Sequence, residues 1–331
     1  MDFAHHAAVM LLALALDALV GDPDRIWRKL AHPAAMMGAA VGWLDARLNK
    51  LELDESVRRR RGVFAIIVLT LGAAAVGALI ALPFRSFASG SALWDALAEG
   101  VIASILIAQN SLHRHVAAVR DAFAVGGLGA ARHAVSMIVG RDPSKLDEDG
   151  VSRAAIESAA ENFSDGVVAP VFWGLLFGLP GLFAYKAINT ADSMIGHKTE
   201  RHLAFGWAAA RFDDLVNLPA ARLSGAIIAI AALVTRRDWR ASLRAMRRDA
   251  RGHASPNAGW PEAAFAGALG IAIGGPRVYS GVRVDVPYMN ADGRKALTIA
   301  DIGPALKLFR AACVVHAGGV AALLAALWAL G

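Results

Sequence analysis

Apolar residues gather in a few long runs along the chain instead of alternating with polar ones. Gly62 to Leu82 is 21 residues without a charge, and Ala311 to Leu330 is a second such run, interrupted only by His316. A helix of this length extends about 31 Å, which matches the hydrocarbon core of a bilayer. The two runs therefore predict membrane-spanning helices.

Five shorter or less uniform apolar runs predict further helices in or at the membrane. They are Ala7 to Val20, Leu93 to Ala108, Val167 to Tyr185, Leu218 to Val234 and Ala263 to Gly275. Together with the two long runs they predict an all-α, polytopic integral membrane protein with about 5–8 membrane-embedded helices.

The run from 167 to 185 has a break at its middle. Its residues Gly178-Leu179-Pro180-Gly181 combine a proline with two glycines, which interrupt a helix. Two half-length helices that meet there would form a re-entrant hairpin, with its irregular backbone buried in protein. In the alternative, this run and the next one both cross the membrane, which places residues 186–217 outside. The hairpin is preferred because it leaves all polar motifs on one side.

Basic residues are unevenly distributed between the apolar runs. Residues 21–61 hold nine Lys or Arg, residues 111–165 hold six, and residues 236–251 hold seven Arg, whereas the short connection after Leu82 holds only Arg85. By the positive-inside rule the basic stretches are cytoplasmic and the N-terminus is outside. We expect one membrane domain over residues 1–331, with cytoplasmic loops at about 21–61, 109–165 and 235–262.

Composition narrows the class of protein further. The chain is 56% hydrophobic and 19% charged with a mean hydropathy of +0.45, whereas a soluble domain has about 25% charged residues. A large soluble protein with buried alanine-rich helices is the competing interpretation, and the two uncharged runs argue against it. The pI near 9.8 is not accompanied by a basic helix with interleaved aromatic residues, so nucleic acid is not an expected partner. Cys313 is the single cysteine, which excludes a disulfide within the chain, and no cysteine-based or HExxH zinc site occurs.

The segment SRAAIESAAENFSDG, residues 152–166, is rich in acidic residues. On a helix, Glu157, Glu161 and Asp165 lie at i, i+4 and i+8 and line one face. Carboxylates at this spacing repel, so a neutralising cation is expected: either Arg153 or a divalent metal with phosphate oxygens, because magnesium binds a few carboxylates plus substrate phosphates. A solvated acidic helix face is the competing interpretation.

Three further polar segments adjoin apolar sequence. The first is AINTADSMIGHKTER, residues 187–201. Its run Gly196-His197-Lys198-Thr199 lacks the spacing and the preceding strand of a P-loop, so a Walker nucleotide site is excluded. In the segment RFDDLVNLPAAR, residues 211–222, two adjacent aspartates are followed one turn later by an asparagine. The segment HASPNAGWPE, residues 253–262, is rich in polar and turn-forming residues, which are as typical of an ordinary loop as of a binding site. The candidate binding residues in these segments are Asn189, Asp192, His197, Lys198, Arg211, Asp213, Asp214, Asn217, Arg222, Ser255 and Asn257.

These motifs, in order along the chain, resemble the CobD/CbiB family of cobalamin biosynthesis. The residues that carry the resemblance are LDALVGDP with a later HP, then ESAAENFSDGVVAPVFW, NTADSMIGHK, FDDLVNLPAARLSG, SPNAGWPEAAFAGALG and GGPRVYSG. The resemblance covers nearly the whole chain. It implies adenosylcobinamide-phosphate synthesis, in which the free propionate of adenosylcobyric acid is amidated by aminopropanol phosphate, or a related amino-alcohol phosphate, with ATP consumed.

Such a ligation needs a carboxylate activated as an acyl phosphate, metal-bound phosphates, and a base for the amine. With this resemblance, Glu157, Glu161, Asp165 and Asp192 are expected to hold magnesium and nucleotide phosphates, and Asp213 and Asp214 to share the metal or base role, so that Glu157, Glu161, Asp213 and Asp214 are the catalytic candidates. Phosphate or corrin amides would be bound by His197, Lys198, Arg211, Arg222, Ser255 and the amides of Asn162, Asn189, Asn217 and Asn257. These roles are exchangeable among the residues.

The resemblance also sets the expected surroundings of the protein. Magnesium and the co-substrate ATP are expected, without haem, disulfide or zinc. The expected partners are corrinoid and phosphorylated amino-alcohol substrates and the lipid bilayer, with a homo-oligomer or other corrin-pathway enzymes left open. The expected location is the inner membrane, multi-pass, with the active site facing the cytoplasm.

Two other functions remain open. The related AmpE-like branch implies a membrane sensor or regulator, and a transporter would use the same polar residues as a translocation path. A transporter built from inverted repeats should have broken helices in both halves, and the sequence has one broken segment without a counterpart.

Overall fold

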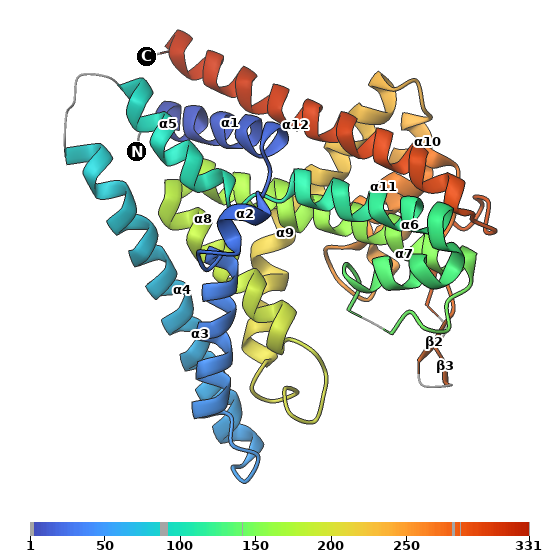
Figure 1. Ribbon diagram of the computed structural model, residues 1–331, viewed down its shortest axis with the longest axis horizontal. Helices are drawn as coiled ribbons and strands as arrows, with labels where there is room; N and C mark the ends of the chain where they lie inside the picture. The colour runs from blue at the N-terminus through green and yellow to red at the C-terminus, as the bar shows by residue number, and fades with distance from the viewer. Residues whose placement is uncertain (1–2, 87–91, 141, 280–281, 285, 331) are drawn as a thin grey trace. The chain divides into compact units, whose positions relative to one another are not determined.

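Helices dominate the computed structural model, which describes residues 3–86, 92–140, 142–279, 282–284 and 286–330 (Figure 1). Within these ranges, four helical segments are long and apolar enough to cross a membrane: Glu55–Phe84, Glu148–Ile195, Trp207–Val234 and Ile299–Leu330. Phe3–Leu19 is a shorter apolar helix. The prediction of an all-α membrane protein is confirmed.

The chain divides into two compact units, which we describe separately. The first comprises residues 1–108, 169–217 and 320–331, and the second comprises residues 109–168 and 218–319. The first unit holds α1 (Phe3–Leu19), α2 (Asp24–Trp27), α3 (Pro33–Leu48), α4 (Glu55–Ser86), α5 (Ala92–Ser104), α8 (Ala169–Ile195), the start of α9 (Trp207–Val234) and the end of α12 (Ile302–Leu330).

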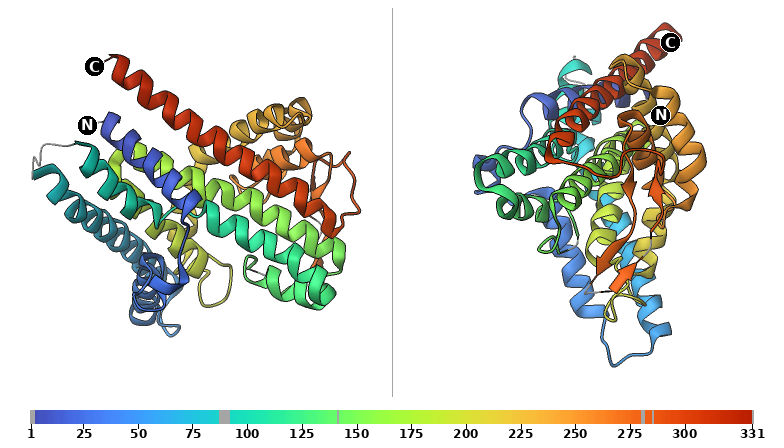
Figure 2. Two further views of the ribbon diagram at one scale, coloured as in Figure 1. Left: turned by 45° about the horizontal axis from the view of Figure 1, so that its top comes forward. Right: turned by 90° about the vertical axis from the view of Figure 1, so that its right-hand side faces the viewer.

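Buried apolar residues of α3, α4, α8 and the start of α9 form the core of the first unit. Helix α4 packs along α8, α3 lies beside α4, and α1 lies beside α5 (Figures 1 and 2). The buried residues of this core are Val41, Leu44, Ala65, Ile66, Leu69, Ala191, Ile195, Phe205, Ala208 and Ala209. The core therefore fixes the C-terminal half of α8 against the N-terminal turns of α9, with the connecting segment 196–206 between them.

Helix α8 reverses direction at the predicted break. Gly178 has φ 65° and ψ −152°, a conformation that glycine adopts readily. A Cβ built on Gly181 would lie 2.4 Å from the carbonyl oxygen of Trp173, although eight residues of continuous helix would separate the two by about 12 Å. The chain therefore folds back on itself here, which confirms the hairpin geometry. That the hairpin enters and leaves on one side of the membrane stays a prediction.

His6 of α1 satisfies a backbone group that this break exposes. Its Nδ1 donates a hydrogen bond of 3.1 Å to the carbonyl oxygen of Leu175, and the side chain is 5% exposed. The last carbonyl groups before a helix break have no partner within the helix. His6, which the sequence gives no functional signal for, thus stabilises the end of the first half of α8.

The second unit contains both the remaining helices and the strands. Its elements are α6 (Gln109–Ser136), α7 (Glu148–Phe163), the π-helical turn η1 (Ser164–Val168), the rest of α9, α10 (Trp239–Asp249), the 3₁₀ turns η2 (Ala250–Gly252) and η3 (Ile299–Asp301), α11 (Gly259–Leu269), β1 (Ile273–Gly274), β2 (Arg277–Tyr279), β3 (Val282–Val284), β4 (Tyr288–Met289) and most of α12. Strand β1 pairs antiparallel with β4, and β2 pairs antiparallel with β3. Helix α7 packs against α6 and α11, and α10 packs against α11 (Figure 1).

The apolar run from Ala263 to Gly275 is not one membrane-embedded helix, so this prediction is wrong. Helix α11 has only 11 residues and ends at Leu269, Gly270 follows in the left-handed conformation, and β1 begins at Ile273. Residues 263–268 are buried by protein, mainly α10 and α7. Burial by protein and burial by lipid select the same apolar residues, so hydropathy alone does not separate them.

Candidate functional site

Three aspartates gather in the first unit, and we call Asp192, Asp213 and Asp214 the aspartate cluster. Asp192 lies near the end of α8, and Asp213 and Asp214 lie in the second turn of α9. The apolar core described above packs these two helix ends together. Asp192 interacts electrostatically with both Asp213 and Asp214. The structure thus brings together acidic residues from two separate sequence motifs.

Asp213 is the most completely enclosed member of the cluster, with 8% of its surface exposed. The side-chain amide of Asn189 donates to its Oδ1 at 3.4 Å, and that of Asn217 donates to its Oδ2 at 3.0 Å. The buried Tyr185 hydroxyl donates to Oδ1 of Asn217 at 2.9 Å. Tyrosine, asparagine and aspartate therefore form a chain of hydrogen bonds that fixes the orientation of the Asp213 carboxylate.

The other two aspartates are more accessible. Both are partly exposed, and Arg211 lies one turn before Asp214, with its Nη1 at 3.8 Å from Oδ2 of Asp214. The Arg211 side chain is 68% exposed. This places an exposed cation beside Asp214, where its guanidinium group can bind a phosphate group.

The segment 196–206, which connects α8 to α9, carries His197 and Lys198 with exposed side chains. A polar network around the buried Asp45 holds the middle of this segment, at Glu200 and Arg201, in place. The Arg201 side-chain nitrogens Nε and Nη2 both donate to Oδ2 of Asp45 on α3, at 3.0 and 2.6 Å. Asn49 donates to Oδ1 of Asp45 at 2.7 Å and to the carbonyl of Arg201 at 2.9 Å.

Arg58 of α4 completes the network. Its Nε donates to Oδ1 of Asn49 at 2.9 Å, and its Nη2 donates to the backbone carbonyl groups of Glu200 and Arg201. Asp45, Asn49 and Arg58 are all buried. The turn between α3 and α4 therefore anchors the segment that carries His197 and Lys198, a structural role that the sequence reasoning missed.

In the second unit, Glu157 is bound to backbone instead of facing open space. Its Oε1 accepts a hydrogen bond of 2.7 Å from the amide of Gly274, and the residue is 6% exposed. Arg153, one turn earlier, donates to Asp149 at 2.8 Å and to the carbonyl groups of Ala272 and Lys295. Both residues tie α7 to the segment 270–297, so a structural role accounts for much of their chemistry.

The predicted acidic face of α7 changes along its length. Glu161 is exposed and Asp165 is partly exposed, while Asn162 donates to the carbonyl and hydroxyl oxygens of Ser158. Asp165 lies in the π-helical turn η1, so its position departs from the i+8 register of a continuous α-helix. Turns of this kind occur frequently at functional sites.

A separate polar group in the second unit joins residues from the two sequence segments 211–222 and 253–262. Arg222 donates to the carbonyl of Leu218 at 2.8 Å and to Oδ1 of Asn257 at 3.4 Å, and its guanidinium lies over the ring of Trp260. The Ser255 hydroxyl accepts hydrogen bonds from the backbone amides of Asn257 and Ala258. Asn257 is 5% exposed, whereas Arg222 is exposed, so the arginine is the member that can reach a ligand.

No group of three or more His, Cys, Asp or Glu residues among the described positions is arranged to hold a metal ion by itself. Magnesium, however, usually takes one or two carboxylates and completes its shell with water and phosphate oxygens. The aspartate cluster offers oxygen ligands of this type, with two partly exposed carboxylates beside a buried third.

Tyr185, just outside the predicted set, belongs with the cluster. Tyr185 begins the hydrogen-bond chain to Asp213, and Lys186 is a partly buried cation in the same turn of α8. An ionisable residue within an apolar helix is itself a signal of function, and Lys186 carries that signal in the sequence.

The sequence is similar to known proteins over nearly all of its length. A sequence model described as CobD/Cbib protein matches residues 10–309. The chain belongs to the CobD/CbiB family. Among its curated relatives is a Sinorhizobium sp. protein named cobalamin biosynthesis protein CobD, which is 51% identical over 95% of this chain and 97% of its own length.

Two more relatives with the same name extend the likeness across the family. The protein from Rhizobium meliloti (strain 1021) is 52% identical over 93% of both chains, and one from Rhodobacter capsulatus is 45% identical over 98% of this chain and 99% of its own. No solved structure matches the chain. The resemblance noted from the motifs is thereby confirmed at the level of the family.

Proposed function

We propose that this chain is the amide-forming ligase of cobalamin biosynthesis, adenosylcobinamide-phosphate synthase. Its substrates would be adenosylcobyric acid, a phosphorylated amino alcohol such as aminopropanol phosphate, and ATP. The observation that carries the proposal is the aspartate cluster, in which Asp213 is enclosed and held by Asn189 and Asn217. Membership of a family whose relatives are named for cobalamin biosynthesis supports the substrate class.

The reaction has two steps, each with its own requirement. In the first, an oxygen of the corrinoid propionate attacks the γ-phosphorus of ATP, which forms an acyl phosphate and releases ADP. In the second, the amine attacks the acyl carbon, the C–N bond forms, and inorganic phosphate leaves. The amine must also lose a proton, which a positioned carboxylate can accept.

The residues of the first unit suit these steps. Asp192 and Asp214 would hold magnesium, which neutralises phosphate charge when it is bound. Asp213 would take the proton from the amine, because its two oxygens are fixed by amide donors and its carboxylate is enclosed. Arg211, Lys198 and His197 are exposed and would bind the phosphate of the amine substrate.

In the second unit, we assign Arg222 to a phosphate or to a corrin amide, because its guanidinium is exposed while Asn257 and Trp260 orient it. Glu161 and Asp165 remain candidates for nucleotide or metal binding because both are accessible. Glu157 is assigned mainly a structural role, because its side chain accepts a hydrogen bond from the backbone of β1. The inner membrane and a cytoplasm-facing active site are part of the same proposal, because ATP and the corrinoid intermediates are cytoplasmic.

Purified full-length protein in detergent tests the proposal directly. With adenosylcobyric acid, aminopropanol phosphate and magnesium-ATP, mass spectrometry should detect adenosylcobinamide phosphate together with one ADP per amide. Asp213→Asn should lower the rate by about 100-fold or more, since a general base contributes roughly 10²–10⁴. Asp142→Asn, at an exposed aspartate of the second unit, is the matched control and should keep normal turnover. Absence of ATP-dependent amide product from well-folded protein would favour the regulator or the transporter.

A further inference from the structure

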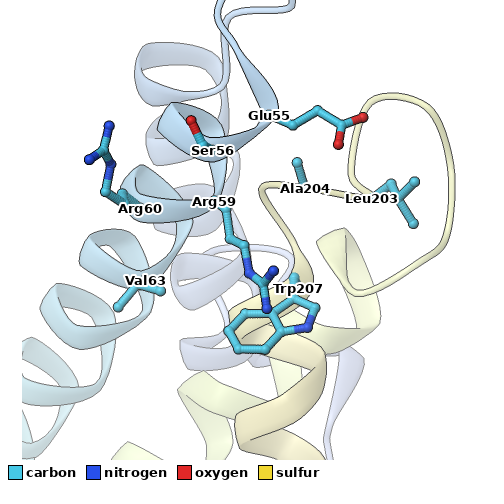
Figure 3. Close-up of a pocket in the computed structure, with 8 residues that line it drawn as sticks. All are labelled: Glu55, Ser56, Arg59, Arg60, Val63, Leu203, Ala204 and Trp207. Atoms are coloured by element: carbon cyan, nitrogen blue, oxygen red, sulfur yellow. The ribbon is translucent and has the colours of Figure 1, made fainter.

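A cavity of about 820 Å³ opens in the first unit at the start of α4, and the three residues of the aspartate cluster are not part of its lining (Figure 3). One side of it is formed by the first turns of α4, and the other by the segment 203–207 that leads into α9. The uncharged run of α4 begins at Gly62. The cavity therefore lies where a membrane-spanning helix passes from apolar sequence into its basic end.

Two arginines supply the charge of the cavity. The guanidinium carbon of Arg59 lies 3.6 Å from the centroid of the Trp207 ring, and this stacking fixes the plane of the guanidinium group (Figure 3). Arg60 follows on the same helix, is exposed, and extends away from Trp207 in Figure 3. A planar, permanently charged guanidinium donates paired N–H groups to phosphate oxygens, so the polar side of the cavity favours a phosphate-bearing ligand.

Hydroxyl-binding groups lie at the same end. Ser56 lies about one turn before Arg59 and Arg60, and the Glu55 carboxylate points toward the segment that carries Leu203 instead of toward Arg59 (Figure 3). Serine can donate or accept a hydrogen bond and a carboxylate accepts them. Two positive charges against one negative charge leave the lining net cationic.

The remaining wall is apolar and continues along the membrane-spanning helix. Val63, Leu203 and Trp207 are exposed by 37, 55 and 40%. Ile67 lies four residues beyond Val63, on the same helix face, and is 50% exposed. A ligand with its phosphate at Arg59 can therefore extend an acyl chain over Val63 and Ile67, which a free phosphate ion cannot use.

We propose that this cavity binds an anionic phospholipid, with phosphatidylglycerol as the representative ligand. Its phosphate contacts Arg59 and is attracted by the nearby charge of Arg60, its headgroup hydroxyls meet Ser56 and Glu55, and one acyl chain follows the apolar face of α4. Basic pockets of membrane proteins on the cytoplasmic side bind anionic headgroups by the same combination of charge and proximity to the bilayer. The site lies outside the residues assigned to catalysis, so the inference does not depend on the proposed ligase activity.

Native mass spectrometry of the purified, delipidated full-length protein tests this assignment. Detergent-solubilised protein titrated with phosphatidylglycerol should bind it at least about tenfold more tightly than phosphatidylethanolamine, which carries no net charge. Arg59→Gln combined with Arg60→Gln should weaken phosphatidylglycerol binding by about tenfold. Arg47→Gln is the matched control, because Arg47 also lies over a tryptophan, Trp43, but outside the cavity; it should bind lipid as the unchanged protein does.

Arg60→Gln alone distinguishes loss of lipid binding from loss of folding, because Arg60 is exposed and does not stack on Trp207. This variant should melt at the normal temperature and still bind phosphatidylglycerol several-fold more weakly. Unchanged phosphatidylglycerol binding in both cavity variants would overturn the assignment. Equal binding of phosphatidylethanolamine would overturn the anionic preference, and displacement of the lipid by an equal concentration of inorganic phosphate would identify a plain anion site instead.

Discussion

Asp45 on α3 accepts two hydrogen bonds from the guanidinium of Arg201, a residue 156 positions later in the chain. Through Arg201 and the amide of Asn49 it anchors the segment 196–206. That segment leads from the C-terminal half of α8, with Asp192, to α9, with Asp213. Contacts from the end of α3 to this connection therefore position the exposed cations that we assign to substrate binding.

Substitution of Asp45 by asparagine should destabilise the protein by about 1 kcal/mol. Asparagine keeps one acceptor oxygen but loses the charge opposite Arg201, whose side chain is 45% exposed, so solvent screening keeps the loss modest. Thermal melting of the purified protein measures the change. Glu52→Gln, at an exposed site of the turn between α3 and α4, should leave the melting temperature unchanged. Equal melting temperatures for Asp45→Asn and the unchanged protein would show that the network does not anchor the segment.

The same residue predicts a pH dependence of stability. Burial raises the pKa of the Asp45 carboxyl, but hydrogen bonds from Asn49 and Arg201 and the charges of Arg201 and His202 outweigh burial, so its pKa lies below the ordinary 3.8. A carboxyl whose pKa is lowered on folding contributes its full stabilisation above the unfolded-state pKa and loses it as pH falls through the folded-state pKa. The melting difference between the unchanged protein and Asp45→Asn should therefore be constant above about pH 4 and shrink below it. A difference that grows on acidification would contradict this account.

Tyr185→Phe should lower kcat of the ligation by roughly tenfold with little change in KM. The substitution removes the donor to Oδ1 of Asn217 and leaves a buried acceptor unsatisfied, which costs about 1–3 kcal/mol and loosens the group that orients Asp213. Steady-state kinetics with saturating substrates measure the effect. Thr190→Val is the matched control, because the Thr190 hydroxyl donates to the carbonyl of Lys186 within α8. Equal rates for Tyr185→Phe and the control would remove the hydrogen-bond chain from the mechanism.

Gly178→Ala should destabilise the fold by about 1–3 kcal/mol. Alanine disfavours a φ of 65°, and its Cβ would lie 2.8 Å from Nε2 of His6, so the histidine that bonds the Leu175 carbonyl must move. Gly72→Ala in α4 is the control: no atom lies within 4 Å of its Cβ, and alanine in a helix should stabilise by up to about 1 kcal/mol. Opposite signs of the two melting shifts are expected. A Gly178→Ala protein as stable as the unchanged one would mean that the turn tolerates a side chain.

The features that the sequence predicted correctly are those that depend on neighbouring residues. The proline and glycines at 178–181 act on their own helix, and Asp213 with Asn217 at i and i+4 must share a face of any helix. Contacts between distant segments leave no such local pattern. Nothing in the sequence near Asp45 indicates that Arg201 is its partner, and Tyr185 reaches Asn217 only because α8 and α9 pack together.

The wrong prediction at Ala263–Gly275 has a related cause. The run is apolar because protein surrounds it, and its helix ends at Leu269 before reaching the length of a membrane span. The acidic residues of α7 illustrate the limit for site prediction. Their spacing predicted one functional face, whereas the Glu157 carboxylate accepts a hydrogen bond from the backbone amide of Gly274, 117 positions away in the sequence.

The exposed cations of the first unit allow the last prediction, which separates substrate recognition from structure. Lys198→Ala or Arg211→Ala should raise the KM for aminopropanol phosphate by roughly tenfold or more, about 1.4 kcal/mol, because charge-assisted contacts to phosphate are strong. Both side chains are exposed, so folding should be unaffected. The KM for unphosphorylated aminopropanol should hardly change, and Lys145→Ala, at an exposed lysine of the second unit, should alter neither value. Equal losses for both amines would mean that Lys198 and Arg211 act on ATP or on the segment's structure, and not on the phosphate of the amine.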